Sequence, residues 1–231
     1  MCEKYYREAI QIMINIEQYA YDNFIRNGDI AYDIGAHVGS VSNLMISRGA
    51  SKVLAFEPSP FNFLELKNNT SHANIECYNV AFNDKEYSCT TQFRDCREDR
   101  QRDSVQDIQY VLMDKYILSN KLDLPQFVKI DIEGMESLIY KNMEFLFTST
   151  RPVIFTEFHV PEENNTNQDY EHNPHWRSGA RGGYDFNELK KHNYSFIDKS
   201  LKLFQDTDFT PYVGHFGRIF IPNEKISTYI K

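Results

Sequence analysis

Apolar side chains recur along the chain at two spacings, one typical of helices and one typical of strands. Residues 3–27 place apolar and aromatic side chains at helical intervals, as at Ile10, Ile14 and Phe24, which predicts an amphipathic helix that covers a sheet. The same periodicity predicts helices at 40–48, 61–69, 135–147 and 186–193. Short apolar runs bounded by turn residues predict strands at 30–34, 52–57, 75–82, 127–132, 152–158, 194–198 and 215–221.

Strands that alternate with helices indicate an α/β fold with a doubly wound, mainly parallel sheet. The length of 231 residues suits one domain. We expect four parts in it: an N-terminal helix, a cofactor-binding core, an insertion and a C-terminal sheet edge, at 1–28, 29–160, 161–183 and 184–231. The charged segment 83–104 predicts a solvated hairpin or a mobile loop. Ligands of such folds lie beyond the carboxyl ends of the strands.

The most informative segment is the glycine turn between the first strand and its helix. It reads Asp33-Ile34-Gly35-Ala36-His37-Val38-Gly39, and its glycines allow a sharp turn and a close ligand. Aligned on Gly35, a dinucleotide fingerprint would need glycines where Asp33 and Val38 stand. An aspartate repels a diphosphate and attracts an ammonium group, so the pattern favours S-adenosyl-L-methionine (SAM) over NAD. Glu57 follows at the next strand end, where an acid can accept ribose hydroxyls.

Composition narrows the class of partner. The net charge is −8, which argues against a broad nucleic-acid surface. No apolar run approaches the roughly 20 residues that span a bilayer, and the charged N-terminus lacks the apolar centre of a signal peptide. The four cysteines show neither a CxxC pair nor zinc spacing, which favours free thiols in a reducing compartment: Cys2, Cys77, Cys89 and Cys96. We therefore expect a cytoplasmic protein.

Five sequence blocks resemble the FkbM family of SAM-dependent methyltransferases. The most discriminating is Lys129-Ile130-Asp131-Ile132-Glu133-Gly134, and the blocks lie at 32–39, 55–58, 79–82, 127–136 and 152–159. The resemblance covers about 30–160 and implies a Rossmann-like class I methyltransferase fold whose C-terminal strand is antiparallel. It also implies methyl transfer to oxygen, commonly a hydroxyl of a sugar or a natural product, and a terminal deoxyhexose of a glycan is one such acceptor.

The resemblance, together with the strand ends, predicts the cofactor site. The amino-acid end of SAM is expected at Asp33, Gly35, Ala36 and Gly39. His37 either contacts the ligand or caps the helix, and Glu57 binds the ribose, with Pro58 shaping the turn after it. Asn79 and Ala81 are expected beside the adenine, although Asn79 also suits a strand interior.

Catalysis is expected where the fourth and fifth strands end. An alcohol needs a base to remove its proton as it attacks, and Asp131, Glu157 and His159 are candidates. Asp131 also suits the methionine end of SAM, and Glu133 either binds the acceptor or anchors the following helix. A metal-free site is expected, with Mg²⁺ held by Asp131, Glu157 and His159 as the alternative.

The insertion at 161–183 is the expected acceptor-binding segment or lid. Its candidate contacts are His175, Trp176, Arg177 and Arg181, and Trp176 could stack on a sugar ring or simply cover the loop. Two other functions remain open. An RNA methyltransferase would need a basic groove, and a non-catalytic module would keep the fold and bind a partner.

Overall fold

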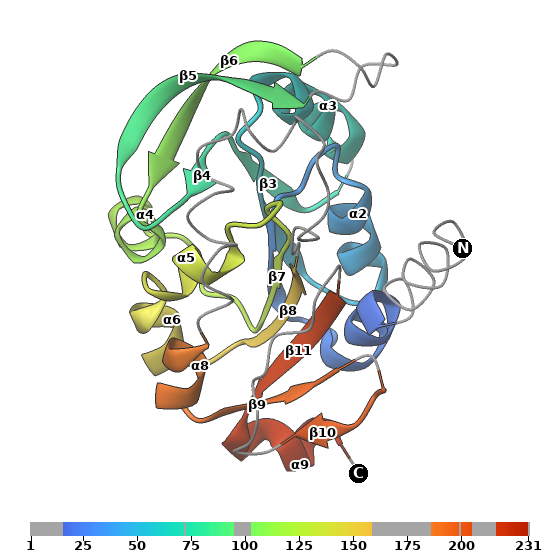
Figure 1. Ribbon diagram of the computed structural model, residues 1–231. Helices are drawn as coiled ribbons and strands as arrows, with labels where there is room; N and C mark the ends of the chain where they lie inside the picture. The colour runs from blue at the N-terminus through green and yellow to red at the C-terminus, as the bar shows by residue number, and fades with distance from the viewer. Residues whose placement is uncertain are drawn as a thin grey trace, which may run out of the picture.

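The computed structural model describes residues 16–71, 73–94, 103–158, 186–198, 200–204 and 216–230. Its centre is an eight-stranded sheet with helices on both faces (Figure 1). The strand order is β10-β9-β11-β8-β7-β1-β2-β3. This order and the helices on both faces confirm the predicted doubly wound fold.

Five parallel strands form the larger part of the sheet: β1 (Ile30–Ile34), β2 (Lys52–Phe56), β3 (Ile75–Tyr78), β7 (Phe127–Ile130) and β8 (Val153–Phe158). Three further strands extend it beyond β8: β9 (Tyr194–Ile197), β10 (Leu203–Phe204) and β11 (Phe216–Pro222). Each of these three pairs antiparallel with its neighbours, so the antiparallel edge contains more than the single strand expected.

Each face of the sheet carries its own apolar core. On one face, the helical residues 16–24 and Met45 of α2 (Ser40–Ser47) pack on side chains that include Phe127 and Phe155. On the other face, a larger aromatic core lies under four helices: α4 (Met113–Asn120), α5 (Glu136–Tyr140), α6 (Glu144–Thr148) and α8 (Asn187–Lys191). The chain also forms α3 (Pro60–Thr70), η2 (Asn223–Lys225) and α9 (Ile226–Tyr229).

The polar segment after β3 forms a second sheet. Its strands are β4 (Ala81–Phe82), β5 (Tyr87–Arg94) and β6 (Asp103–Val111). The hairpin of β5 and β6 confirms one of the two predictions for this segment, and β4 pairs parallel with β6. The single strand predicted at 75–82 was wrong, because the chain leaves the large sheet after Tyr78 and joins the small one at Ala81.

The predicted helix at 135–147 was also wrong as one element. It is divided into α5 and α6, with Met143 in a non-helical conformation between them. The cause lies on α4: Asp114 Oδ2 accepts a hydrogen bond of 2.9 Å from the backbone N–H of Phe145, and the N–H of Asp114 donates to the carbonyl of Asn142. Asp114 therefore supplies the cap that begins α6, which local periodicity does not reveal.

Because β1, β2, β7 and β8 are parallel, their carboxyl ends meet at one edge of the sheet, here called the rim. The order reverses between β1 and β7, since β1 continues to β2 on one side while β7 continues to β8 on the other. Such a reversal is where α/β sheets bind ligands. Among the described residues, no helix has both the length and the hydrophobicity needed to cross a bilayer.

Candidate cofactor site

The turn after β1 needs glycine at two positions. Gly35 has a φ of +81°, and a Cβ there would lie 1.8 Å from the carbonyl oxygen of Asp131. Gly39 has a φ of +90°, and its Cβ would meet the side chains of Leu66 and Thr70 on α3 below 3.0 Å. Any side chain would therefore force the turn away from β7 and from α3. The backbone N–H groups of Gly35 and Ala36 both donate to the carbonyl of Phe56, which holds the turn against β2.

Glu57 connects the turn to the end of β2. Its carboxylate accepts hydrogen bonds of 2.9 Å from the backbone N–H groups of His37 and Ser59. Burial raises the pKa of Glu57 to about 7, against the opposing effect of these donors. The side-chain amide of Asn62 also donates to this carboxylate, at 3.3 Å. A carboxylate offers about four lone-pair sites, so Glu57 retains capacity for one further donor, and its contact with a ribose hydroxyl stays a prediction.

The surroundings of His37 and Asn79 bear on the roles predicted for them. His37 is exposed, yet partial desolvation first, and then the charge of Lys129, lower the pKa of its imidazole. The side-chain amide of Asn79 donates to the carbonyls of Glu57 and Pro58, at 2.8 and 2.9 Å. Asn79 thus fixes the turn after β2, while its contact with adenine stays a prediction. Ala81 pairs with Tyr110 in the small sheet, and its role also stays a prediction.

A buried lysine joins the turn to β7. The ammonium of Lys129 donates to the carbonyl of Gly35 at 2.9 Å and lies 3.3 Å from one carboxylate oxygen each of Asp33 and Asp131. These three side chains, Lys129, Asp33 and Asp131, are called the rim cluster below. Burial by itself lowers the pKa of Lys129, but the charges of Asp131 and Asp33 outweigh it, so the pKa is raised and the ammonium stays charged.

The two aspartates of the rim cluster differ in exposure. Asp33 is fully buried, and its second oxygen accepts a hydrogen bond of 2.6 Å from Ser42. The side chain of Asp131 is 27% exposed. Direct binding of an ammonium group by Asp33 stays a prediction, and its burial favours a role in shaping the turn. Asp131 is the member of the cluster that a ligand can reach.

The turn after β7 is braced by Glu136. Its Oε1 accepts a hydrogen bond of 2.9 Å from the N–H of Gly134, and the side chain is fully buried. Glu136 therefore anchors this turn, and both roles considered for Glu133, which is exposed, stay predictions. Both Glu133 and Gly134 have positive φ, at +58° and +99°, so this turn reverses tightly beside Asp131.

The remaining predicted residues divide into two groups. Glu157 is half-buried near the end of β8, where it pairs with Gly217 of β11, so it shares the rim with Asp131. The others lie outside the described residues: His159, His175, Trp176, Arg177 and Arg181. Their predicted contacts with acceptor or metal stay predictions.

Lys129 is the site residue to which sequence analysis assigned no role. A lysine between Val128 and Ile130 in an apolar strand was the available signal, because a charge inside a buried strand needs a partner. Its partners could not be named, since Asp33 and Gly35 belong to a strand and a turn far away in the sequence.

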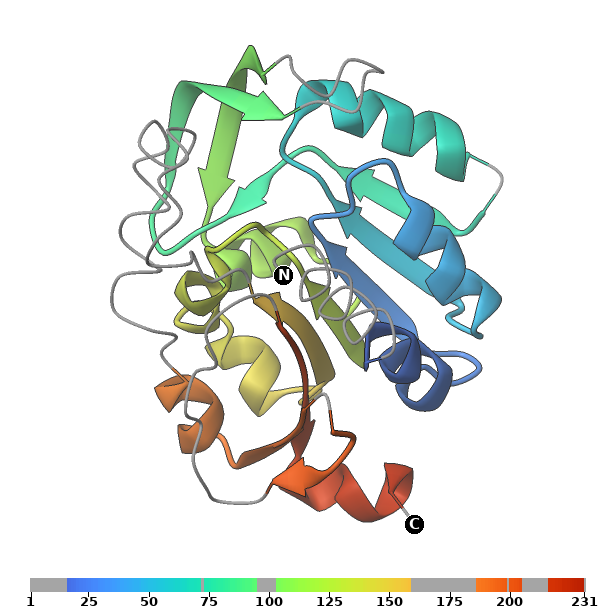
Figure 2. The same ribbon diagram turned by 45° about the vertical axis from the view of Figure 1, so that its right-hand side comes forward.

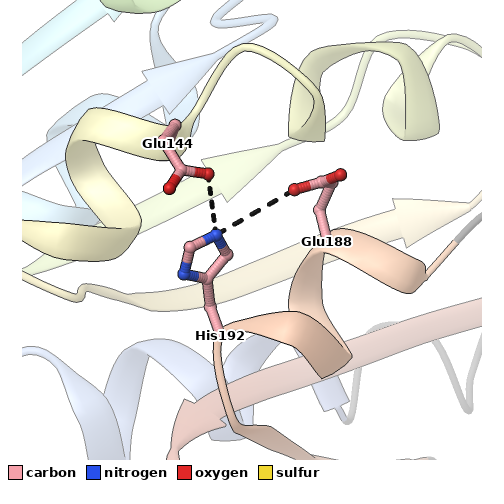
Figure 3. A group of neighbouring side chains, drawn as sticks. All are labelled: Glu144, Glu188 and His192. Atoms are coloured by element: carbon pink, nitrogen blue, oxygen red, sulfur yellow. Dashed lines mark hydrogen bonds and ion pairs between the residues drawn. The ribbon is translucent and has the colours of Figure 1, made fainter.

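Elsewhere, one cluster of described residues has the spacing of metal ligands. Glu144, Glu188 and His192 bring their ligand atoms within 4.8 Å of one another (Figure 3). Lys191 already lies 3.0 Å from Glu144 and 3.3 Å from Glu188, so an ammonium compensates both carboxylates. The cluster lies near the start of β8, at the edge opposite the rim, since Tyr194 next to it bonds the carbonyl of Pro152. It is an ion-pair network that joins α6 to α8.

Comparison with known proteins identifies the family to which the chain belongs. A family model, the methyltransferase FkbM domain, matches residues 33–196, which is more than half of the 231 residues. The chain belongs to the FkbM methyltransferase family. The match includes the turn, the rim cluster and Glu57, which confirms the resemblance drawn from the sequence blocks. No curated protein sequence matches the chain.

Two solved structures resemble the FkbM chain described here. An FkbM methyltransferase of Methylobacillus flagellatus KT has a TM-score of 0.53 at 17% identity, over 84% of this chain and 43% of the other. A ribosomal protein L11 methylase of Lactobacillus delbrueckii subsp. bulgaricus has a TM-score of 0.49 at 8% identity, over 93% of this chain and 79% of the other. The chain thus spans less than half the length of the M. flagellatus protein, and the similarity supports the class I methyltransferase fold.

SAM is the cofactor of this family, and the chemistry of the rim fits it. Glu57, at the end of β2, is the residue predicted to accept ribose hydroxyls. The rim cluster sets two carboxylates against one ammonium, so the site has negative charge left for a cationic ligand. SAM carries an ammonium and a sulfonium, and it lacks the phosphates that such a site would repel.

Proposed function

We propose that this methyltransferase transfers the methyl group of SAM to a hydroxyl of a sugar or glycan. The observation that supports it is the accessible carboxylate of Asp131, held at the rim by Lys129 at 3.3 Å. A hydroxyl acceptor must lose a proton as it is methylated, and a rim carboxylate is placed to receive it. A terminal deoxyhexose remains one acceptor within this class, on the resemblance to the family alone.

The rim residues would have different roles in methyl transfer. SAM supplies an electrophilic methyl group on a sulfonium. The turn after β1 and Glu57 orient the cofactor, so that little rotational freedom remains to be lost during the reaction. Asp131 accepts the hydroxyl proton, and His159 and Glu157 are the alternative bases. Lys129 keeps Asp131 in one position, and the backbone reverses tightly beside it at Glu133 and Gly134.

The test is methyl transfer from labelled SAM to a panel of monosaccharide glycosides that includes deoxyhexoses. Transfer to a sugar hydroxyl, lost in Asp131→Asn or in His159→Ala, supports the proposal and identifies the base. Binding of S-adenosylhomocysteine (SAH) is measured for each variant, so that loss of the base is distinguished from loss of the cofactor site. Labelling of RNA, or of another hydroxyl compound but no sugar, would contradict the proposed acceptor class.

A further inference from the structure

The helical residues 16–24 lie against the sheet face that leads to the rim (Figure 2). Tyr21 packs edge-on against Phe127 of β7 and Phe155 of β8, with ring centroids 6.0 Å apart in each case. Ile16 lies so close to Gly217 that a Cβ there would come within 2.8 Å of its methyl group. Gly217 pairs with Glu157 near the end of β8. Ile16 therefore lies at the level of the rim, and the later residues of the helix lie farther from the rim.

The sheet face under this helix changes from apolar to charged as it approaches the rim. Alternate residues of a strand share a face, so Lys129 and Asp131 follow Phe127, and Glu157 follows Phe155. The apolar part is covered by Tyr21. One turn before Tyr21, toward the rim, the helix carries a glutamate in place of an apolar side chain.

That glutamate is Glu17, and Tyr21 holds it in place. The Tyr21 hydroxyl donates a hydrogen bond of 2.7 Å to Glu17 Oε1. The charges of Lys129, Asp131 and Asp33 all act on the Glu17 carboxyl, and burial together with the two aspartates raises its pKa. The Lys129 ammonium in turn responds to Asp131, Asp33, Glu17 and Glu157. Asp33 and Asp131 lie 3.3 Å from this ammonium, and the charges of Glu17 and Glu157 also act on it, so the acids that act on this one cation outnumber it.

We propose that Glu17 is a cofactor-binding residue that receives the α-ammonium group of SAM on the helix side of the rim. An ammonium group donates three hydrogen bonds, and charge-assisted bonds in a partly buried site are stronger than those at an exposed surface. Glu17 precedes residues 33–196, to which the family model extends, so the family match does not assign it. The inference concerns the cofactor alone and is independent of the acceptor.

Two ligands isolate the amino-acid end of the cofactor, and the choice of variant isolates its ammonium group, because a glutamate attracts the ammonium and repels the carboxylate. SAH carries the amino-acid end, whereas 5′-methylthioadenosine shares its adenosine and thioether but lacks that end. In isothermal titration, Glu17→Gln is expected to weaken SAH binding about tenfold, equivalent to one charge-assisted hydrogen bond. The affinity for 5′-methylthioadenosine is expected to stay unchanged.

The matched control is Asp22→Asn, which removes the same charge from the outer side of the same helix, where Asp22 pairs with Arg48. It is expected to leave both affinities unchanged. If Glu17→Gln weakens both ligands equally, or neither, Glu17 only supports packing and the proposal is wrong. Should Glu17→Gln fail to fold, Glu17→Asp gives the same test, because it keeps the charge but withdraws it by one methylene. A severalfold loss for SAH alone is then the expected result.

Discussion

Two clusters of charged side chains lie at opposite edges of the sheet, and they differ in how deeply their charges are buried. In the rim cluster, Lys129 is 3% exposed and Asp33 is fully buried. In the other, here called the surface cluster and made of Glu144, Glu188, Lys191 and His192, Lys191 is 57% exposed. Water solvates and screens the second group, but it cannot replace a missing partner in the first.

The clusters also differ in what they hold together. The Lys129 ammonium contacts Asp33 in β1, the carbonyl of Gly35 in the turn and Asp131 after β7, so one cation joins the whole cofactor turn to the neighbouring strand. The surface cluster only joins two short helices. The comparison teaches that the number of charges in a cluster says little about its importance, whereas their burial and connections say much.

The largest expected effect follows from removing the buried cation. Lys129→Met leaves Asp33 buried without its ion pair, which is expected to lower the free energy of unfolding by about 3–5 kcal/mol. Urea denaturation followed by circular dichroism measures it. The double variant Asp33→Asn/Lys129→Met is expected to recover part of the loss, since it also removes the uncompensated charge. A loss below about 1 kcal/mol would mean that burial does not govern the rim cluster.

A smaller effect is expected from the buried acid Glu57, which has no lysine of the described segments within hydrogen-bond distance. Its pKa is raised from 4.5 to about 7, so the folded chain holds this proton over a range where the unfolded chain has lost it. Its contribution to stability is therefore complete below pH 4.5 and decreases as the pH rises to 7, by about 3 kcal/mol at most. Glu57→Gln should flatten this part of the curve of melting temperature against pH. An unchanged curve would contradict the assignment.

A buried but uncharged pair of side chains is expected to contribute less to the free energy of unfolding than Lys129 or Glu57. The hydroxyls of Tyr140 and Thr156 share a hydrogen bond of 2.7 Å in the core. Tyr140→Phe leaves the Thr156 hydroxyl without it and is expected to cost about 1–2 kcal/mol, measured by urea denaturation. Tyr140→Phe/Thr156→Val removes both hydroxyls and should cost little more than the single variant. If the single variant costs as much as Lys129→Met, charge adds nothing to the effect of burial.

The smallest effect is expected in the surface cluster. Lys191→Met removes the ammonium that lies beside Glu144 and Glu188, and the melting temperature should stay within the reproducibility of the measurement at physiological salt. A clear decrease would show that the comparison underestimates exposed charge networks. A clear increase in melting temperature with added Zn²⁺ in the same variant would instead show that Lys191 had been occupying a metal site.

Much of the fold was predictable because it depends on short-range patterns. Strands and turns are predicted from a few neighbouring residues, as in the apolar run Ile30–Ile34 followed by glycine and the run 52–57 followed by Pro58. The helix from 135 to 147 was misjudged because its interruption depends on Asp114, which bonds Phe145 across the fold. The small sheet was misjudged because β4 finds its partner in β6, about thirty residues later.

The sequence by itself determined which chemical groups would gather at the rim, since parallel strands place their carboxyl ends together and Asp33, Glu57, Asp131 and Glu157 end four of them. Only the tertiary structure decided which of these acids is buried and which is accessible. Lys129 pairs with both the buried Asp33 and the partly exposed Asp131, and the helical residues 16–24 place Glu17 where the charges of all three act on it. The physical reason is that burial and electrostatic partnership depend on distances in space, which the order of residues along the chain does not record.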